Sequence, residues 1–191
     1  MATKEFTHLH VHTEYSMLDG AARLGDLFTH AKELGMKSMA TSDHGFLFGA
    51  FDFWRQAKAH DIKPIIGVEA YLTPGTHRTD RSRVRWGDGS RDDVSGGGAY
   101  THMTMWAETT EGMHNLFRAS SIASLEGQLY KPRMDREVLQ TYSKGLIATT
   151  GCPSGEIQTR LRLGQFDEAI QAASDFRDIF GKDNFYCEVM D

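Results

Sequence analysis

The sequence predicts an α/β protein whose sheet is mainly parallel and either open or closed into a barrel. Short apolar runs alternate with longer segments of helical periodicity along most of the 191 residues, which is typical of strands joined by helices. The run at residues 64–72 is almost continuously apolar, as expected for a strand buried on both faces of a parallel sheet. A chain of this length can form one domain with a substantial core.

The first part of the chain predicts three strands and two helices. In the first helix, apolar side chains such as Leu24 and Phe28 recur on one helical stripe. Gly35 follows that stripe, and glycine there is typical of a left-handed helix end. In the second helix, Phe51 and Trp54 recur at helical spacing. We expect strands at residues 6–11, 37–41 and 64–72, and helices at residues 22–34 and 48–60.

Residues 73–99 interrupt this alternation. They show no periodicity and contain five arginines and a run of three glycines. We interpret them as a long exposed loop inserted into the domain, because segments of this length without periodicity are unusual in compact domains. We expect the arginines to form a solvated surface, and contact with nucleic acid is the alternative.

The alternation resumes after the loop. We expect strands at residues 100–107, 145–150 and 184–190, and helices at residues 111–125, 156–163 and 166–180. These bring the total to six strands. No internal repeat is present, so a single domain over residues 1–191 is expected.

Composition excludes several classes of protein. The net charge of -5 argues against a domain that holds nucleic acid by bulk charge alone. Two cysteines provide no disulfide framework, which fits a reducing cytoplasm. No window approaches the roughly 20 consecutive apolar residues of a membrane helix, and the first residues do not resemble a signal peptide. We therefore expect a cytoplasmic protein without a membrane partner.

Histidines cluster near the start of the chain. All nine lie within the first 114 residues, and five lie within the first 44. His8, His10 and His12 alternate, so in a strand their imidazoles would share one face. Buried imidazoles need partners for both ring nitrogens, and metal ligation supplies them. For His8 we favour a structural or supporting role.

Further metal-ligating side chains follow several predicted strands. Asp19 lies in a turn, His44 and Cys152 follow strands, and Glu69 and His102 lie within strands. Ligands of parallel α/β folds gather at the carboxyl ends of strands. We therefore predict that seven side chains form one metal site: His10, His12, Asp19, His44, Glu69, His102 and Cys152. Surface or core positions are expected for His30, His60, His77 and His114, and a small hydrophobic role for Cys187.

Residues 8–20 read His-Leu-His-Val-His-Thr-Glu-Tyr-Ser-Met-Leu-Asp-Gly, and this segment resembles the opening motif of the polymerase and histidinol phosphatase (PHP) domain. Residues 41–45, 63–71, 101–104 and 149–155 continue the likeness in order. Within that family the chain is most similar to the type at the amino terminus of bacterial DNA polymerase III alpha subunits, in its actinobacterial form. The resemblance covers nearly the whole chain and is weakest at residues 73–99.

The resemblance implies a fold, an activity and partners. It implies a distorted, TIM-like (β/α)7 barrel with up to three metal ions, whose ligands fall on the seven side chains named above. Ligand-complete members are metal-dependent 3′–5′ exonucleases that proofread primer ends within a DNA-directed DNA polymerase, a nucleotidyltransferase. We assign the catalytic roles to His12, Asp19 and His44. The implied partners are the DNA primer 3′ end, the rest of the polymerase chain and replisome subunits such as the sliding clamp.

The sequence departs from the family pattern at one point. The family has two further ligands, an aspartate and a histidine two residues apart on the last strand, and this pair is absent after Cys152. We therefore interpret the chain as a piece that is truncated before the last strand. We expect these 191 residues alone to hold fewer than three ions and to show little exonuclease activity.

The donor set also bears on the metal and on alternative functions. Imidazole, carboxylate and one thiolate favour zinc, with manganese or iron as alternatives. Asp43 is expected to orient a histidine, and His8 and Glu14 are the candidates for a general acid. Two other functions remain open: a small-molecule phosphoesterase of the histidinol-phosphatase type, and a metal-stabilised structural module without turnover.

Overall fold

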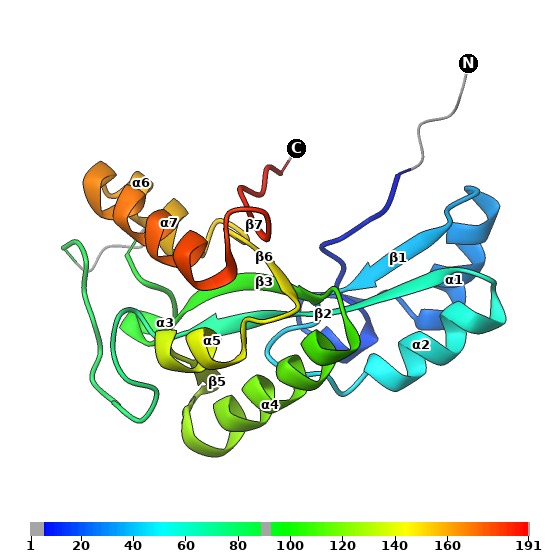
Figure 1. The fold of residues 1–191 in the computed structure, drawn as a ribbon, viewed down its shortest axis with the longest axis horizontal. Coiled ribbons are helices and arrows are strands. Elements are labelled where there is room, and N and C mark those ends of the chain that lie inside the picture. The colour runs from blue at the N-terminus through cyan, green and yellow to red at the C-terminus, as the bar shows by residue number, and fades with distance from the viewer. Residues whose placement is uncertain (1–5, 89–92, 191) are drawn as a thin grey trace.

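A computed structural model of the chain describes residues 6–88 and 93–190 (Figure 1). A short 3-10 helix lies at Glu14–Ser16. The α-helices are α1 (Leu24–Glu33), α2 (Ala50–Ala59), α3 (Ser95–Gly98), α4 (Thr110–Glu126), α5 (Arg136–Tyr142), α6 (Glu156–Arg162) and α7 (Phe166–Phe180). The strands are β1 (Ser38–Thr41), β2 (Lys63–Leu72), β3 (Thr101–Ala107), β4 (Gln128–Leu129), β5 (Lys131–Met134), β6 (Leu146–Thr149) and β7 (Phe185–Tyr186).

The five helices predicted from periodicity are confirmed as α1, α2, α4, α6 and α7. Their ends follow from local chemistry. Gly35 adopts a φ of 74° after α1, as predicted from its position. The hydroxyl of Thr109 accepts a hydrogen bond from the backbone N–H of Gly112, which satisfies a free donor at the start of α4.

The strands of the described ranges join into one mixed sheet in the order β4-β5-β2-β3-β6-β7, with β1 paired to the first half of β2. The prediction of a mainly parallel sheet is wrong, because β3 runs antiparallel to both β2 and β6. A parallel β3 would need a crossover that spans the sheet. Instead, β3 begins at the end of the sheet where β2 stops, with Thr101 opposite Leu72.

The antiparallel direction of β3 brings its first residues beside the last residues of β2. His102 lies opposite Tyr71, and Thr104 lies opposite Glu69. Side chains alternate between the two faces of a strand. Met103 on β3 is therefore buried in the main core, whereas Glu69 and His102 point to the opposite face.

Two predicted strands differ from the structure. Residues 6–11 form no strand, although the carbonyl of His8 accepts from the N–H of Ala40 and the carbonyl of Val11 accepts from the N–H of Ser42. The segment thus follows β1 with too few paired groups for a ladder. The last predicted strand, at residues 184–190, shortens to β7.

Three short elements between α4 and β6 were not predicted, namely β4, β5 and α5. Arg133 of β5 is 1% exposed although it carries a charge. Its guanidinium donates to the backbone carbonyls of Arg78, Asp80, Ala99 and Gly127. Four carbonyl oxygens therefore replace the water that a buried guanidinium loses.

Residues 73–88 and 93–99 are irregular apart from α3, and the described arginines differ in their surroundings. Arg78 lies 2.7 Å from a carboxylate oxygen of Glu126 and 3.0 Å from one of Asp135. Arg83 donates to the carbonyls of Gly96 and Gly97. Arg81 and Arg85 are exposed, and the fifth arginine, Arg91, lies outside the described residues.

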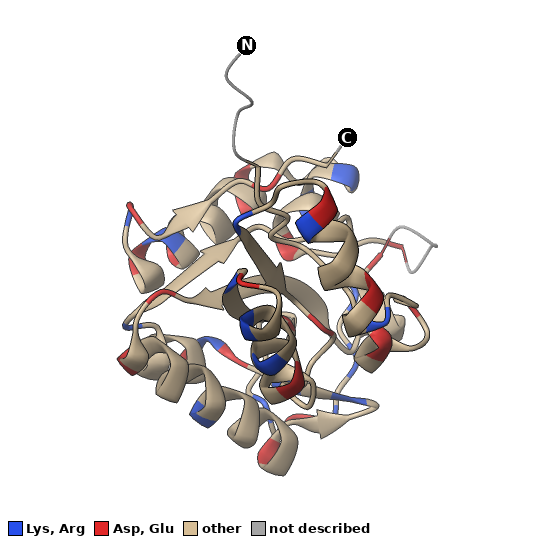
Figure 2. Ribbon diagram, turned by 90° about the vertical axis from the view of Figure 1, so that its right-hand side faces the viewer, with Lys and Arg blue, Asp and Glu red and all other residues tan. Residues whose placement is uncertain are grey.

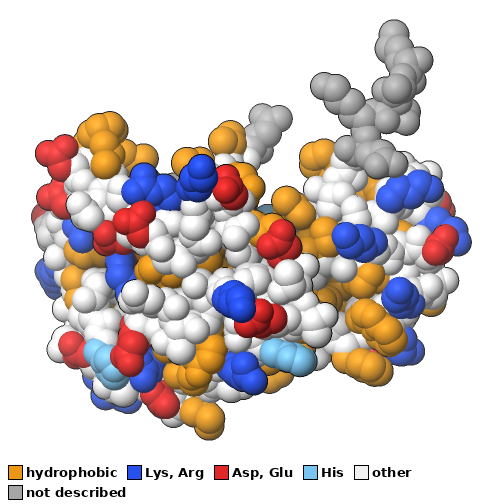
Figure 3. Space-filling model, in the orientation of Figure 1, with side chains coloured by type: hydrophobic (Ala, Val, Ile, Leu, Met, Phe, Trp, Pro, Cys, Tyr) orange, Lys and Arg blue, Asp and Glu red, His pale blue; other side chains and the backbone are white. Residues whose placement is uncertain are grey.

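Two hydrophobic cores flank the sheet. The larger core joins β2, β3 and β6 to α4, α5 and α7, and the smaller one joins α1 and α2 to β1. In α2 the buried residues are Phe53 and Ala57. The expected stripe is instead exposed at Phe48, Phe51 and Trp54, and hydrophobic side chains are visible on the side of the molecule that α2 forms (Figure 3).

Charges are distributed without strong separation. Figure 2 shows Lys and Arg interspersed with Asp and Glu over the helices. None of the helices in the described part of the chain has the length and apolar character needed to cross a membrane. Figure 3 shows the surface hollowed on the side where both termini lie.

Candidate metal centre

One cavity of about 360 Å³ gathers all of the side chains that the sequence predicts as metal ligands. They come from the extended amino-terminal segment, the turn before α1, the end of β1, β2, β3 and the loop after β6. The remaining lining residues are Pro153, Ser154 and Met190. The convergence of these side chains is therefore observed, whereas ligation of a metal by them stays a prediction.

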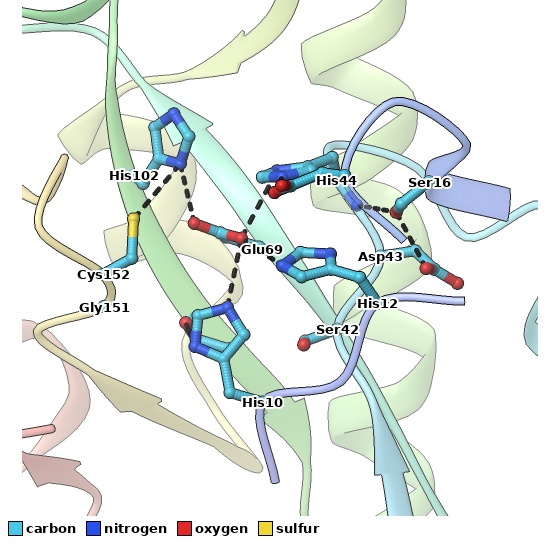
Figure 4. Close-up of polar contacts among 12 residues, drawn as sticks. His10, His12, Ser16, Ser42, Asp43, His44, Glu69, His102, Gly151 and Cys152 are labelled. Carbon is cyan, nitrogen blue, oxygen red and sulfur yellow. Dashed lines mark hydrogen bonds and ion pairs between the residues drawn. The ribbon is translucent and has the colours of Figure 1, made fainter. Parts of the chain in front are cut away.

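Glu69 is the centre of the cluster (Figure 4). Its side chain is 1% exposed, and its two carboxylate oxygens face imidazoles from separate segments of the chain. The distances from Glu69 are 3.1 Å to His10 Nε2, 2.9 Å to His12 Nε2, 3.3 Å to His44 Nδ1 and 2.7 Å to His102 Nδ1. One buried carboxylate thus holds four imidazoles together.

The strand pairings explain these distances. His102 lies two residues from the direct partner of Glu69 on β3, and such diagonal pairs lie within reach of long side chains. His44 follows β1 and forms a parallel bridge with Glu69. His10 is positioned by its neighbours, because the carbonyl of Leu9 accepts from the indole N–H of Trp106 at 2.9 Å.

Asp19 lies at the rim, with 63% of its side chain exposed. Its Oδ2 is 2.7 Å from Nε2 of His44. The expectation that Asp43 orients a histidine stays a prediction, because none of the hydrogen bonds of its carboxylate goes to an imidazole of the described residues. Asp43 instead accepts from the N–H of Thr13 at 2.7 Å and from the hydroxyl of Ser16 at 2.8 Å, so it anchors the turn that carries Asp19.

Cys152 enters from the loop after β6. Its Sγ lies 3.6 Å from Nδ1 of His102. Gly151 precedes it with a φ of 76°, a conformation that glycine adopts at little cost. Burial and the nearby charge of Glu69 raise the pKa of the Cys152 thiol to about 12, so in the metal-free chain this residue is a neutral thiol.

Glu188 contacts His10 of the cluster, and the sequence did not predict this residue as part of the site. Its Oε1 lies 2.5 Å from Nδ1 of His10, and its Oε2 accepts from the hydroxyl of Thr149 at 2.5 Å. The alternation of histidines near the start of the chain gives no indication of a glutamate 178 positions later. A single carboxylate in a short apolar stretch carries no spacing signal.

The carboxylates and imidazoles of the cluster shift one another's pKa values. Burial raises the pKa of Glu69, but hydrogen bonds from His10, His102 and His12 outweigh burial and hold the pKa well below its usual range. Burial lowers the pKa of His10, but Glu188 and Glu69 outweigh it and raise the pKa to about 9. Burial lowers the pKa of His44, which favours its neutral, metal-binding form.

The residues present fit a metal centre. His12 Nδ1 and His44 Nδ1 are buried and make no hydrogen bond among the described residues, because the 3.3 Å approach of His44 Nδ1 to Glu69 lacks hydrogen-bond geometry, although buried ring nitrogens are usually paired. Ligand atoms within 4.8 Å of one another form three groups that share members. The groups are His10–His12–Glu69, His12–Asp19–His44 and His44–Glu69–His102.

The other candidates lie outside the cavity. The ring of His8 packs against Phe6 at 4.8 Å, and Glu14 accepts from the N–H of Leu24 at the start of α1. His77 lies near Asp135 and Glu137, but Arg78 already pairs with both carboxylates. His30 and His60 make local contacts with Glu33 and Gln56, His114 lies on α4, and Cys187 is exposed.

A family model described as PHP domain matches residues 8–191. The chain belongs to the PHP domain family. The match includes all seven side chains that converge on the cavity of this PHP domain. The family resemblance inferred from the motifs is therefore confirmed.

Curated relatives of this PHP domain are DNA polymerase III alpha subunits. The subunit of Saccharopolyspora erythraea is 59% identical over 200 residues, which cover 100% of this chain and 17% of the relative. That of Mycobacterium tuberculosis is 55% identical over 193 residues, with 100% and 16% covered. That of Deinococcus radiodurans is 44% identical over 193 residues, with 98% and 14% covered. The chain therefore spans less than a fifth of the length of these relatives.

Two solved structures share a more distant likeness. One is a candidate metal-dependent phosphoesterase from Bifidobacterium adolescentis, with a TM-score of 0.48 and 14% identity over 88% of this chain and 75% of that chain. The other is an amidohydrolase from Chromobacterium violaceum, with a TM-score of 0.47 and 12% identity over 95% of this chain and 84% of that chain.

Proposed function

We propose that this PHP domain is part of a DNA polymerase III alpha subunit and acts as a metal-dependent 3′–5′ exonuclease on primer ends. The observation that carries the proposal is the contact of the buried Glu69 carboxylate with four imidazoles in one cavity. A carboxylate and histidines from separate segments are costly to bury, and shared metal ligation explains why they lie together.

The proposal assigns a role to each donor. His10, His12, His44, Glu69 and His102 would hold divalent ions inside the cavity, and Cys152 would add a thiolate when an ion displaces its proton. Asp19 would complete the set from the rim, where it is exposed to an incoming strand. His12, Asp19 and His44 share one of the three donor groups, and we assign the catalytic roles to them.

Divalent ions, when bound, supply a water activated as nucleophile and charge stabilisation for the phosphate and leaving oxygens. Zinc suits the mixture of imidazole, carboxylate and thiolate, with manganese or iron as alternatives. The residues of this chain contribute fixed positions. Because Asp43 anchors the turn and Glu69 fixes the imidazoles, the donors need little rearrangement to receive ions.

The proposal extends to architecture and partners. We propose that the mixed sheet belongs to a distorted, TIM-like (β/α)7 barrel that holds up to three ions. The DNA primer 3′ end is the substrate, and the rest of a DNA-directed DNA polymerase and the sliding clamp are partners in the cytoplasm. The relatives, all DNA polymerase III alpha subunits, support this setting.

The test compares two substrates on two forms of the protein. The 191-residue chain and a full-length polymerase that carries it are stripped of metal, reloaded with zinc or manganese, and assayed on a 3′-labelled single-stranded primer and on histidinol phosphate. We expect metal-dependent release of the 3′ nucleotide by the full-length polymerase. The Asp19→Asn variant should lose that release while it retains polymerisation.

The alternatives give different results. Hydrolysis of histidinol phosphate with no primer degradation would identify a small-molecule phosphoesterase. Bound metal with no turnover of either substrate would identify a structural module. Primer degradation by Asp19→Asn at the parental rate would remove Asp19 from the catalytic site.

A further inference from the structure

Glu188 contacts the histidine cluster from outside. His10 presents Nε2 to Glu69 at 3.1 Å and Nδ1 to Glu188 at 2.5 Å. The two carboxylates therefore lie on opposite nitrogens of one ring. Glu188 belongs to none of the groups whose ligand atoms lie together among the described residues, so its position is that of a support rather than a ligand.

The chemistry of imidazole gives this support a function. A neutral imidazole carries one proton, and the nitrogen without the proton is the one that binds metal. In the metal-free chain both ring nitrogens of His10 face a carboxylate, which can only accept, so both carry a proton. When an ion displaces the proton on Nε2, Glu188 retains the proton on Nδ1, so the lone pair of Nε2 is the one that binds the ion.

Glu188 is itself held in place. The hydroxyl of Thr149 donates to its second carboxylate oxygen at 2.5 Å. Its backbone N–H donates to the hydroxyl of Thr150 at 3.0 Å, and that hydroxyl also accepts from the side-chain amide of Gln158 at 2.9 Å. Because the end of β6 fixes both the backbone and the carboxylate, Glu188 has little freedom to leave His10.

We infer that Glu188 is a positioning residue for the metal centre, which holds His10 in the tautomer that presents Nε2 to an ion. The inference rests on the proposed metal-dependent function and adds a residue that neither the motif nor the donor set contains. Residues that orient a metal-bound histidine contribute about 10- to 100-fold to metal affinity.

The test measures binding of Zn²⁺ alone, by competition with a chromophoric chelator, and, in the Zn²⁺-loaded chain, the protonated nitrogen of His10, by ¹⁵N–¹H NMR of the imidazoles. Glu188→Ala and Glu188→Met both remove the acceptor, and Met keeps the length if Ala fails to fold. We expect each to weaken Zn²⁺ binding about 10- to 100-fold and to lose the single Nδ1–H tautomer of His10. Glu188→Gln keeps an acceptor and should restore both readouts to within about threefold of the parent.

The chain contains a matched control. His30 and Glu33 form a second histidine–glutamate pair, with Nδ1 3.3 Å from the carboxylate, on the exposed surface of α1. Glu33→Ala should change neither readout. His12→Ala, which removes a proposed ligand, should weaken Zn²⁺ binding whether or not Glu188 is also substituted.

The outcomes separate this inference from the proposed function. Parental affinity in Glu188→Met, together with weakened binding in His12→Ala, would overturn the role of Glu188 and leave the metal centre standing. Weakened binding with an unchanged His10 tautomer would also overturn it, as would a changed tautomer with parental affinity. A parent chain that binds no Zn²⁺ would overturn the proposed function and this inference together.

Discussion

The guanidinium of Arg133 donates a hydrogen bond of 2.8 Å to the backbone carbonyl of Asp80, 53 positions earlier in the chain. Together with its bonds to Arg78 and Ala99, this contact fastens both ends of an irregular segment to β5. Shape in this part of the molecule therefore depends on one buried side chain rather than on a ladder of strand hydrogen bonds.

Arg133→Met should lower the free energy of unfolding by about 3 kcal/mol, because several buried carbonyls lose their donor while the apolar volume is roughly kept. Urea unfolding checks the value, and limited proteolysis should show faster cleavage near Asp80. Arg55→Met is the control, since Arg55 is exposed and pairs with Asp52 alone among the described carboxylates. Its change should stay below about 0.5 kcal/mol. Equal effects of the two variants would contradict the role given to Arg133.

Glu69→Gln should weaken Zn²⁺ binding by more than about 100-fold, since it removes the one charge shared by four imidazoles. Chelator competition and elemental analysis measure the loss. Glu111→Gln, at an exposed position on α4, serves as the control for the charge change. Retention of parental metal content by Glu69→Gln would contradict a central role for this carboxylate.

The metal-free chain should become less stable as the pH rises from 6.5 to 8.5. The pKa of His10 rises from 6.5 to about 9 on folding, so its contribution is present below about pH 6.5 and is lost as the pH rises through about 9. The expected loss in unfolding free energy is about 2 kcal/mol over that window. Urea unfolding in the presence of a chelator measures it, and His10→Gln should flatten the slope. An equally steep slope in His10→Gln would show that the loss of stability comes from the titration of another group.

Cys152→Ser should reduce zinc affinity more than manganese affinity, because the thiolate is the soft ligand of the set. A loss of about 10-fold or more for zinc is expected. Parallel titrations with both metals check the difference. Cys187→Ser is the matched control, since Cys187 is exposed and does not line the cavity. Equal losses for the two metals would remove the thiolate from the proposed ligand set.

Two phenylalanines of α2 should respond very differently to truncation. Phe53 is 1% exposed and Phe51 is 70% exposed. Phe53→Ala should cost about 3–5 kcal/mol through lost burial and a cavity, whereas Phe51→Ala should cost less than about 0.5 kcal/mol. Urea unfolding of both variants measures the contrast. A large cost for Phe51→Ala would show that its face is packed in solution.

The gathering of donors could be predicted from sequence because it depends on local rules. Side chains alternate along β2, so Glu69 points to one face of the sheet while Val68 and Ala70 point to the other. The apolar neighbours identify the face that packs in the larger core. His44 and Cys152 follow strands, and strand ends meet at one edge of a sheet. The rule does not cover His102, which lies at the start of β3 and reaches the same edge of the sheet only because β3 is antiparallel to β2.

The direction of β3 and the role of Glu188 required the path of the whole chain. Whether a strand is parallel depends on where its connection runs, and residues 73–100 have no periodicity that reports it. The exposed face of α2 was mispredicted for a related reason. Phe51 and Trp54 have the spacing of a buried stripe, but the smaller core contacts the adjacent face at Phe53.

The contact between His10 and Glu188 joins residues 178 positions apart, which has a consequence for the order of folding. Closing a loop of that length costs more chain entropy than any contact within a helix, so the pair forms late. During synthesis, His10, His12 and His44 leave the ribosome long before Glu188. The cavity, which Met190 also lines, is therefore completed only when β7 docks, and an ion that arrives earlier meets a His10 that Glu188 does not yet hold.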